Sequence, residues 1–257
     1  MKQKINHFRD LHHQADPLLI GNVWNVQSAK VFENLGYKAI ATSSAAVAES
    51  LGYADGQAMS FEEYLFIVRR IAKSTSLPLS VDLESGYGNN ADEIVRNIRQ
   101  LQELGIVGIN IEDSVINNGK REIADAHRFA DLLASITSAI RQDERLFINV
   151  RTDVFLLGLQ HPVEEGKRRL ARYEKTGIDG LFFPCITERE HIQAIVAEAT
   201  LPVNVMCMPA LPDFVTLKAL GVKRISMGNF VNKEVYKHLE SMMKKIDAAK
   251  SFSPVFQ

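Results

Sequence analysis

Two carboxylates stand two positions apart in the stretch SVDLESGYGNN, residues 80–90, where an apolar run gives way to glycines. Asp82 and Glu84 are expected on one face of an extended strand, because alternate side chains point the same way. Glu112 closes another apolar run. Three carboxylates crowded together repel one another, and at least one binds a proton unless a cation is present. A hard divalent ion with oxygen ligands relieves this repulsion, so the acids predict a magnesium site.

Magnesium usually keeps several of its waters, so one directly bound carboxylate and two others that hold those waters are sufficient. Mn²⁺ is the expected substitute for Mg²⁺. The alternative is that the acids only cap strands and pair with Arg or Lys side chains at the rim.

The elements that must position these acids are short apolar runs that alternate with amphipathic stretches. Eight runs resemble strands: 18–22, 39–44, 79–84, 108–113, 147–152, 180–185, 203–207 and 224–229. Apolar residues between them recur at helical spacing. This alternation over 257 residues predicts an α/β fold, a parallel (β/α)8 TIM barrel, with an open doubly wound sheet as the alternative. No Gly-, Ser- or Pro-rich linker divides the chain, so residues 1–257 are expected to form a single domain.

Active sites of such barrels lie at the carboxyl ends of the strands. Polar or aromatic residues follow most of the eight runs, and these are the candidates for chemistry. They are Asn22, Trp24, Ser43, Ser44, Asp82, Glu84, Glu112, Asp113, Arg151, Asp153, Asn204 and Asn229.

Composition narrows the class of partner. The formal net charge is -1 with 24% charged residues, and no basic stripe predicts nucleic-acid binding. No apolar run approaches the roughly 20 residues that span a bilayer, so no membrane association is expected. The first residues lack the apolar segment of a signal peptide, which favours a cytoplasmic protein. A small molecule is therefore the expected partner.

Histidines and cysteines add little to this prediction. His7, His12 and His13 lie on a predicted N-terminal helix away from the strand ends, and we expect them at the surface or at an interface. Cys185 and Cys207 occur inside apolar runs without metal-binding spacing, so they are expected to be buried core thiols.

The motifs resemble those of the isocitrate lyase and phosphoenolpyruvate mutase superfamily. Its barrel members carry Asp-x-Asp-x-Gly-Tyr-Gly after the third strand, Glu-Asp after the fourth and Arg after the fifth. Here the matching residues are 82–88, Glu112 with Asp113, and Arg151. The similarity extends to residues 21–56 and covers most of the chain.

The resemblance implies a ligand set for the metal. Asp82 would be the main magnesium anchor, with Glu84 and Glu112 acting through waters. Asp55 would match a further acid near the metal. Tyr87 beside the motif is a candidate proton donor or acceptor, together with Arg151 and Asp55 in the expected catalytic set. The alternative for Tyr87 is that its ring packs on the barrel top.

Further residues would bind the substrate. Ser43, Ser44 and Ala45 would cradle its carboxylate or phosphonate, and Arg151 would contact the same anion. Trp24 is expected to close the first loop. Two more candidates to face the substrate are Glu188, after the sixth strand, and Asn204, on the seventh.

The implied activity is that of a Mg²⁺-dependent lyase or mutase. It would cleave or form a C–C or P–C bond in a small 2-oxo, 2-hydroxy or phosphonate acid through an enolpyruvate-like anion. One alternative is a hydrolase of oxaloacetate or phosphonopyruvate-type acids. Another is a non-catalytic binding or regulatory barrel.

Three departures from the superfamily pattern bear on the reaction. Glu84 replaces the usual Asp, and Pro184 stands where the mutase branch has His. Residues 114–126 lack both the Lys-Arg-Cys-Gly-His gate of the lyases and the longer gating loop of the mutases. We expect the shortened segment to be a solvated turn that leads into the next helix. The alternative is a short lid formed by Asn117, Asn118, Lys120 and Arg121.

The C-terminal residues 231–250 have the spacing of a long amphipathic helix. Its apolar face comprises Val231, Val235, Leu239, Met242, Met243 and Ile246. The helix could pack on its own barrel. The resemblance implies instead that neighbouring subunits exchange it, in a homo-oligomer that is a dimer or a tetramer.

Overall fold

The structure is a computed structural model that describes residues 2–56, 58–140 and 145–256. Its main sheet is parallel, and the strand order is β1-β11-β10-β9-β8-β5-β4-β3-β2. The strands are β1 (Leu18–Leu19), β2 (Gly21–Val23), β3 (Ile40–Thr42), β4 (Leu79–Asp82), β5 (Gly108–Glu112), β8 (Phe147–Arg151), β9 (Gly180–Phe183), β10 (Val203–Met206) and β11 (Arg224–Ser226).

The first two strands close the sheet into a barrel. Only Ile20 separates β1 from β2, so the two form one bent strand. Leu18 pairs with Arg224 of β11, and Gly21 pairs with Ile40 of β3. This segment therefore joins both edges of the sheet, and the predicted (β/α)8 barrel is confirmed. Each of the eight predicted runs contains a strand of it.

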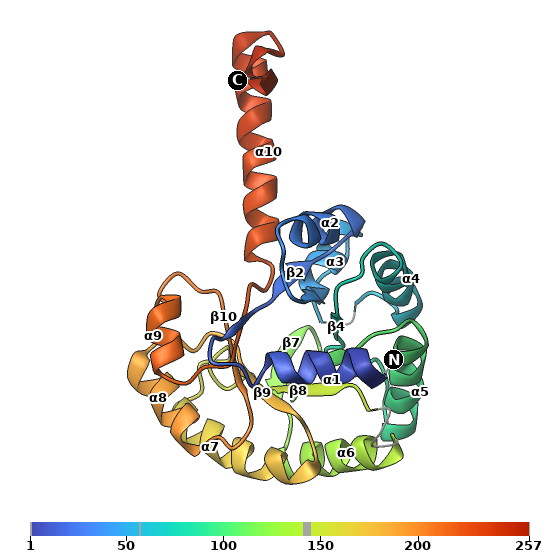
Figure 1. The fold of residues 1–257 in the computed structure, drawn as a ribbon, viewed down its shortest axis with the longest axis vertical. Helices are drawn as coiled ribbons and strands as arrows, with labels where there is room; N and C mark the ends of the chain where they lie inside the picture. The colour runs from blue at the N-terminus through green and yellow to red at the C-terminus, as the bar shows by residue number, and fades with distance from the viewer. Residues whose placement is uncertain (1, 57, 141–144, 257) are drawn as a thin grey trace.

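Helices surround the barrel (Figure 1). They are α1 (Lys2–Leu11), α2 (Val26–Asn34), α3 (Ser44–Ser50), α4 (Phe61–Ala72), α5 (Ala91–Glu103), α6 (Ala126–Ala139), α7 (Pro162–Tyr173), α8 (Arg189–Glu198) and α9 (Phe214–Ala219), with short 3-10 turns at Glu174–Thr176 and Ser253–Phe256. Helix α5 illustrates why these segments are helical. Asn90 caps its first turn, and Ile94, Ile98 and Leu101 form one buried stripe.

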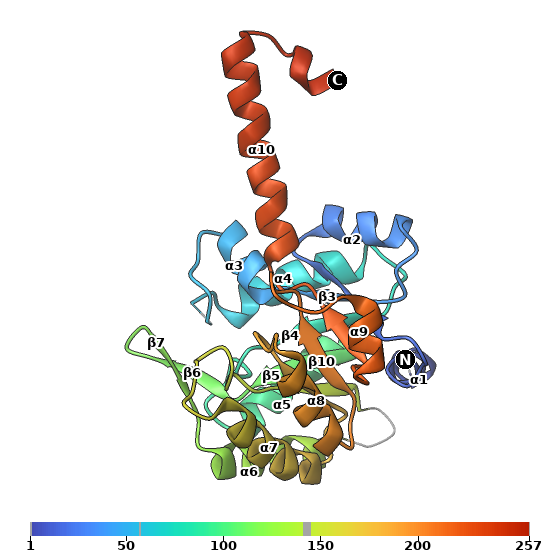
Figure 2. The ribbon, with the colours of Figure 1, turned by 90° about the vertical axis from the view of Figure 1, so that its left-hand side faces the viewer.

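Helix α1 covers the amino-terminal end of the barrel (Figure 2). Its apolar side chains are buried, and the ring of His12 stacks on Phe147 with centroids 4.1 Å apart. The Nδ1 of His12 is 2.8 Å from the carbonyl oxygen of Phe8. Burial lowers the pKa of His12 to about 3, so its ring is neutral. The predicted surface position is wrong for His12, whereas His7 and His13 are exposed.

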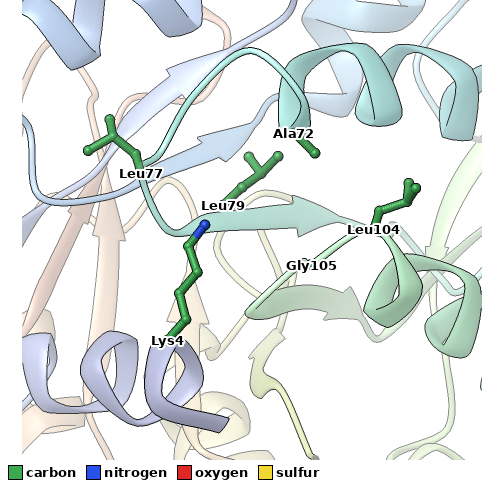
Figure 3. A pocket seen from close by; sticks show the side chains of 6 residues that line it. All are labelled: Lys4, Ala72, Leu77, Leu79, Leu104 and Gly105. Carbon is green, nitrogen blue, oxygen red and sulfur yellow. The ribbon is translucent and has the colours of Figure 1, made fainter. Parts of the chain in front are cut away.

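A pocket of about 220 Å³ lies at this same end (Figure 3). It is lined by Lys4, Ala72, Leu77, Leu79, Leu104 and Gly105. Lys4 is the ionisable residue in this lining, and burial lowers its pKa. A single amine among aliphatic side chains offers little for catalysis. We therefore expect the active site at the carboxyl end of the barrel strands.

Helix α10 (Phe230–Ala249) projects away from the barrel (Figures 1 and 2). Asn232 is its buried residue, whereas Val235, Leu239 and Met243 are about half exposed. Packing of this helix on its own barrel is therefore excluded for the described chain. No helix among the residues described is long and apolar enough to cross a membrane.

The shortened gate segment forms a β-hairpin. Strands β6 (Ser114–Asn117) and β7 (Lys120–Ile123) pair antiparallel. Asn118 and Gly119 between them have φ of 48° and 74°, as a tight two-residue hairpin turn requires. The predicted solvated turn is wrong, because the local Asn-Gly sequence folds the segment back on itself instead of leading it directly into α6.

The cysteines also differ from expectation. Cys207 is exposed, and Cys185 is half-buried with φ of 63°. Neither thiol belongs to the barrel core, because both residues lie just beyond the carboxyl ends of their strands, where the chain leaves the sheet.

Candidate active site

The acids meet at the carboxyl end of the barrel through a sharp turn after β4. Strand β4 ends at Asp82, and the chain then takes positive φ at Glu84 (50°), Gly86 (110°) and Tyr87 (53°). A Cβ at Gly86 would lie 2.7 Å from Ile94, so glycine fits both the space and the angle. Glu84 thus reaches the site through a left-handed turn, and the simple strand alternation expected from the sequence does not extend this far.

Backbone hydrogen bonds hold this turn against the next strand. The amide of Glu112 donates to the carbonyl of Glu84 at 2.8 Å, and the amide of Leu83 donates to Asn110 at 2.9 Å. The Asn97 side chain donates to the carbonyls of Gly86 and Tyr87 at 3.1 and 2.8 Å. These bonds fix the Glu84 and Glu112 side chains beside each other.

The carboxylates of Asp82 and Glu84 are buried and incompletely paired. Ser44 donates its hydroxyl to Oδ2 of Asp82 at 2.8 Å. Oδ1 of Asp82 and Oε2 of Glu84 are buried and have no hydrogen-bond partner among the described residues. An unpartnered buried carboxylate oxygen is costly. Burial raises the pKa of Asp82, and burial with the neighbouring Asp82 and Glu112 charges raises the pKa of Glu84 to about 8.

Two arginines converge on the third acid, Glu112. Nη1 of Arg151, at the end of β8, lies 3.0 Å from Oε2 of Glu112. Arg121, on β7 of the hairpin, forms an ion pair with the other oxygen, Oε1. Burial nevertheless outweighs both cations and raises the pKa of Glu112 to about 7.

Asp153 extends the same network. Arg151 donates to it from Nε at 2.6 Å and from Nη2 at 3.1 Å. Ser114 donates to it at 2.6 Å, and Nη1 of Arg121 lies 3.3 Å away. The Nη2 of Arg121 also pairs with Asp55 at 3.3 Å. The sequence placed Asp55 and Arg151 here, but Arg121 and Ser114 were missed as members of the site.

These donors suit a divalent cation that keeps most of its waters. The described residues contain no group of three His, Cys, Asp or Glu side chains arranged as a ready cage. Magnesium does not need such a cage, because one direct carboxylate and bound waters are sufficient. The free Oδ1 of Asp82 and the free Oε2 of Glu84 are the atoms that a cation or its waters would satisfy.

The predicted anion cradle begins helix α3. Ser43 is its N-cap, and its hydroxyl accepts from the amide of Ala46 at 3.3 Å. The amides of Ser44 and Ala45 belong to the first turn, where no intrahelical acceptor exists. Trp24 follows β2, is 8% exposed and donates its backbone amide to Ser28 at 3.1 Å.

Tyr87 lies between the acid cluster and two aromatic rings. Its hydroxyl is 3.4 Å from Oε1 of Glu84, and its ring packs near Phe61 and Tyr64 with centroids 5.7 and 5.8 Å away. Burial, followed by the charges of Glu84 and Asp82, raises the pKa of Tyr87. The phenol therefore keeps its proton at neutral pH.

Two predicted substrate contacts lie away from this cluster. Asn204 is 1% exposed inside the barrel, where it donates to the carbonyl of Val205 at 2.6 Å and to Ser226 at 3.2 Å, and accepts from Asn149 at 3.2 Å. Glu188 is exposed at the N-cap of α8. Asn204 thus belongs to a polar layer in the barrel interior, and Glu188 lies at the rim of the barrel.

A pocket of about 810 Å³ opens beside the acids and the hairpin. Its walls come from the loop before α4, the turn after β4, the hairpin and α6. They include Asp55, Gly56, Glu84, Ser85, Glu112, Ser114, Val115, Ile116, Arg128, Phe129 and Leu132. This pocket reaches Glu84, Glu112 and Asp55, whereas Asp82 and Arg151 are not among its lining residues.

The sequence of this chain is similar to one protein family and to several known proteins. The family model named phosphoenolpyruvate phosphomutase matches residues 8–247. An uncharacterised protein of Mycobacterium tuberculosis H37Rv is 32% identical over 225 residues, 86% of this chain and 81% of that protein. The oxaloacetate decarboxylase of Bradyrhizobium sp. BTAi1 is 30% identical over 190 residues, 71% of this chain and 64% of that enzyme.

Solved structures show the same fold. A Burkholderia cenocepacia J2315 crystal structure, provisionally assigned as a phosphonomutase, has a TM-score of 0.86 and 34% identity, and the match covers 94% of this chain and 99% of that chain. A phosphonopyruvate hydrolase in complex with oxalate and Mg²⁺ has a TM-score of 0.87 over 98% of this chain and 89% of that one, but at 22% identity it supports the fold alone.

The barrel and the acids at its mouth define the class: a (β/α)8 protein with an anionic site at the carboxyl ends of its strands. The chain belongs to the phosphoenolpyruvate phosphomutase family, as the family match over residues 8–247 establishes. The resemblance to the isocitrate lyase and phosphoenolpyruvate mutase superfamily is thereby confirmed, and this superfamily comprises enzymes of lyase and mutase type.

Proposed function

We propose that this protein is a Mg²⁺-dependent enzyme that cleaves a C–C bond in a small 2-oxo or 2-hydroxy dicarboxylic acid, with oxaloacetate-type acids as the first candidates. The observation that carries the proposal is the meeting of Asp82, Glu84 and Glu112 at the barrel mouth, where Oδ1 of Asp82 and Oε2 of Glu84 are buried without a hydrogen-bond partner among the described residues. The related oxaloacetate decarboxylases support the choice of bond.

The chain's own residues would hold the cation from one side. Asp82 is the direct ligand, through its free Oδ1, and Ser44 orients this carboxylate from Oδ2. Glu84, Glu112 and Asp55 would hold bound waters. Mg²⁺ at this position supplies Lewis-acid stabilisation of negative charge that develops on the 2-oxygen of the substrate.

The substrate carboxylate would lie between the start of α3 and Arg151. The free amides of Ser44 and Ala45 supply neutral donors, and Arg151 supplies positive charge. Arg151 is held in place by Asp153 at 2.6 and 3.1 Å, so its planar guanidinium is fixed before an acid binds. A fixed donor loses little freedom on binding, which favours orientation of the substrate.

Decarboxylation suits a site without a gate cysteine. The hairpin, residues 114–123, contains no thiol. When a 2-oxo dicarboxylic acid of the oxaloacetate type loses the carboxylate that lies β to its 2-oxo group as CO₂, the electrons of the broken C–C bond remain as an enolate, so no base has to remove a proton first. A proton is needed only afterwards, at carbon. We assign its donation to the neutral phenol of Tyr87, which then recovers a proton from water.

Exposed apolar side chains on α10 support an oligomer built through this helix. Val235, Tyr236 and Leu239 line a groove of about 350 Å³ with Trp24 and residues of α2. Apolar side chains of a projecting helix gain by burial against a second copy. We propose that α10 is exchanged between subunits of a homodimer or tetramer, which would place the partner's helix beside the first loop of the site.

The test is turnover of a panel of 2-oxo, 2-hydroxy and phosphonate acids with Mg²⁺, with oxaloacetate first. Wild type and Asp92→Asn, a control acid exposed on α5, should release CO₂ from oxaloacetate at equal rates. Asp82→Ala should lose about 10³-fold in kcat, the scale expected when the main electrostatic stabiliser is removed. Equal turnover by Asp82→Ala, or none by wild type across the panel, would refute the proposal.

A further inference from the structure

Arg121 holds the β6–β7 hairpin down on the acid cluster. Its guanidinium contacts three segments that are distant in sequence: Glu112 at the end of β5, Asp153 after β8 and Asp55 before α4. It also donates to Ser114 at 2.8 Å. The Arg121 side chain is 15% exposed, and those of Glu112 and Asp153 are 4% and 0% exposed. The pairs with Glu112 and Asp153 are protected, so bulk solvent screens them less than pairs at the surface. The pair with Asp55, whose side chain is 49% exposed, is not protected in this way.

The rest of the hairpin has few comparable attachments. In β6 the residues after Ser114 are exposed, and Val115 and Ile116 expose 37% and 40% of their surface. Ile116 approaches the loop at Gly56. The bond from Asn117 to Glu122 at 2.9 Å joins the two strands to each other and not to the barrel. Arg121 is therefore the main polar link between the hairpin and the barrel mouth.

The same acids serve the cation of the proposed function. Arg121 contacts Oε1 of Glu112, and Glu112 and Asp55 are two of the carboxylates assigned to the metal's waters. The Arg121 guanidinium and the metal ion would share these carboxylates. Each positive charge therefore weakens the attraction of the carboxylates for the other. Such coupling is reciprocal. If Arg121 lowers the affinity of the site for the metal, bound metal weakens the attachment of the hairpin by the same free energy.

We propose that Arg121 is a positioning residue that competes with the divalent ion for the acid cluster and thereby couples metal binding to release of the β6–β7 hairpin. The hairpin forms one wall of the pocket of about 810 Å³, so its release opens the approach to Glu84 and Glu112. This inference rests on the proposed function, because it requires that Asp82 and its neighbours bind a cation.

Calorimetric titration of Mg²⁺ into the full-length protein tests the competition. Arg121→Gln removes the charge and keeps a polar side chain, while Lys120→Gln is the matched control, since Lys120 lies on the same hairpin and is exposed. Arg121→Gln should bind Mg²⁺ about tenfold more tightly, within the usual range of coupling between sites. Lys120→Gln should bind like wild type, and equal affinity for all three would overturn the inference.

Hydrogen exchange of the hairpin amides, residues 115–123, tests the release without reference to activity. In wild type, saturating Mg²⁺ should accelerate exchange of these amides. In Arg121→Gln they should exchange fast already without metal and respond little to it. Slow, metal-independent exchange in both proteins would overturn the inference.

The two proposals fail differently. If wild type and Arg121→Gln both bind Mg²⁺ with the same affinity, the metal site stands and the competition is wrong. If neither binds Mg²⁺, the metal-dependent function is wrong, and the competition with it. Mg²⁺ binding by both proteins, tighter in Arg121→Gln, would support both.

Discussion

Two buried acidic regions lie side by side in this barrel, and their hydrogen bonding differs. Asp113 is fully paired: it accepts from Thr152 at 2.7 Å, from Arg169 and Tyr173 at 2.9 Å each, and from the amide of Asp153 at 3.1 Å. Asp82 and Glu84 each keep a buried oxygen without a partner among the residues described.

We propose that this difference separates structural from functional acids. A buried carboxylate with four donors is stabilised by its surroundings and has no capacity left for a ligand. Oxygens left without a donor raise the free energy of the folded protein and can be satisfied by a cation that binds there. Glu112 and Asp113 are sequence neighbours at the end of β5 with different surroundings: Glu112 pairs with Arg121 and Arg151 beside Glu84, and Asp113 pairs with Arg169 and Tyr173.

The largest expected effect concerns the stability of the paired region. Asp113→Ala should lower the free energy of unfolding by about 3–5 kcal/mol, because it leaves Arg169 buried without its counter-ion. Asp113→Asn, which keeps two acceptor positions, should lose less. Asp82→Ala should lose less than either, since one of its oxygens has no partner to lose. Urea unfolding measures all three, and equal losses would remove the distinction between the regions.

A smaller effect, on turnover, is expected from removal of the Tyr87 hydroxyl beside Glu84. Tyr87→Phe should lower kcat about 10²-fold, the low end of general acid catalysis, and leave affinity for oxalate with Mg²⁺ unchanged. The ring contacts with Phe61 and Tyr64 survive in this variant. Steady-state kinetics with oxaloacetate, beside calorimetry of oxalate, separates the two parameters. Full turnover by Tyr87→Phe would assign the residue to packing alone.

The smallest expected effect is a dependence of the free energy of unfolding on pH that originates at Glu84. Its pKa is about 8 in the folded protein against 4.5 as the reference value, mainly through burial. Between these values the folded protein holds a proton that the unfolded chain has released. The stability contributed by this group is therefore complete below pH 4.5 and is lost as the pH rises through about 8.

Urea unfolding in EDTA between pH 5 and 9 measures this slope. Stability of wild type should fall more steeply with pH than that of Glu84→Gln, whose side chain does not ionise. Glu49→Gln, at an exposed position on α3, should follow wild type. If Glu84→Gln and wild type gave parallel profiles, Glu84 would be an ordinary ionised acid.

Much of this arrangement could be predicted from the sequence. Alternating apolar runs and amphipathic stretches specified the barrel, and the rule that chemistry lies at strand ends selected Asp82, Glu112 and Arg151. Both signals are local in sequence, and the fold only has to bring the strand ends together. The direction of the Asn204 side chain does not follow from the sequence, because a strand residue can point into the barrel interior as readily as toward the mouth.

The role of Arg121 could not be predicted in the same way. Asn118-Gly119 is a recognised hairpin signal and could have revealed the turn. The length of the arginine side chain and the direction of the hairpin decide whether it reaches Glu112, and neither follows from spacing. The left-handed turn at Glu84 was equally hidden, since non-glycine residues seldom adopt positive φ. For His12, a polar residue at the end of a helix gave no sign that Phe147 would cover it.

The most direct test of the central claim, that Asp82 and its neighbours form a cation-dependent site for a small acid, is calorimetric titration of oxalate with and without Mg²⁺. Oxalate is a planar mimic of the enolpyruvate-type anion. The account predicts that wild type and Asp92→Asn bind oxalate only when Mg²⁺ is present, and that Asp82→Ala does not bind it. Absence of binding by wild type in both conditions, or unchanged binding by Asp82→Ala, would contradict the account.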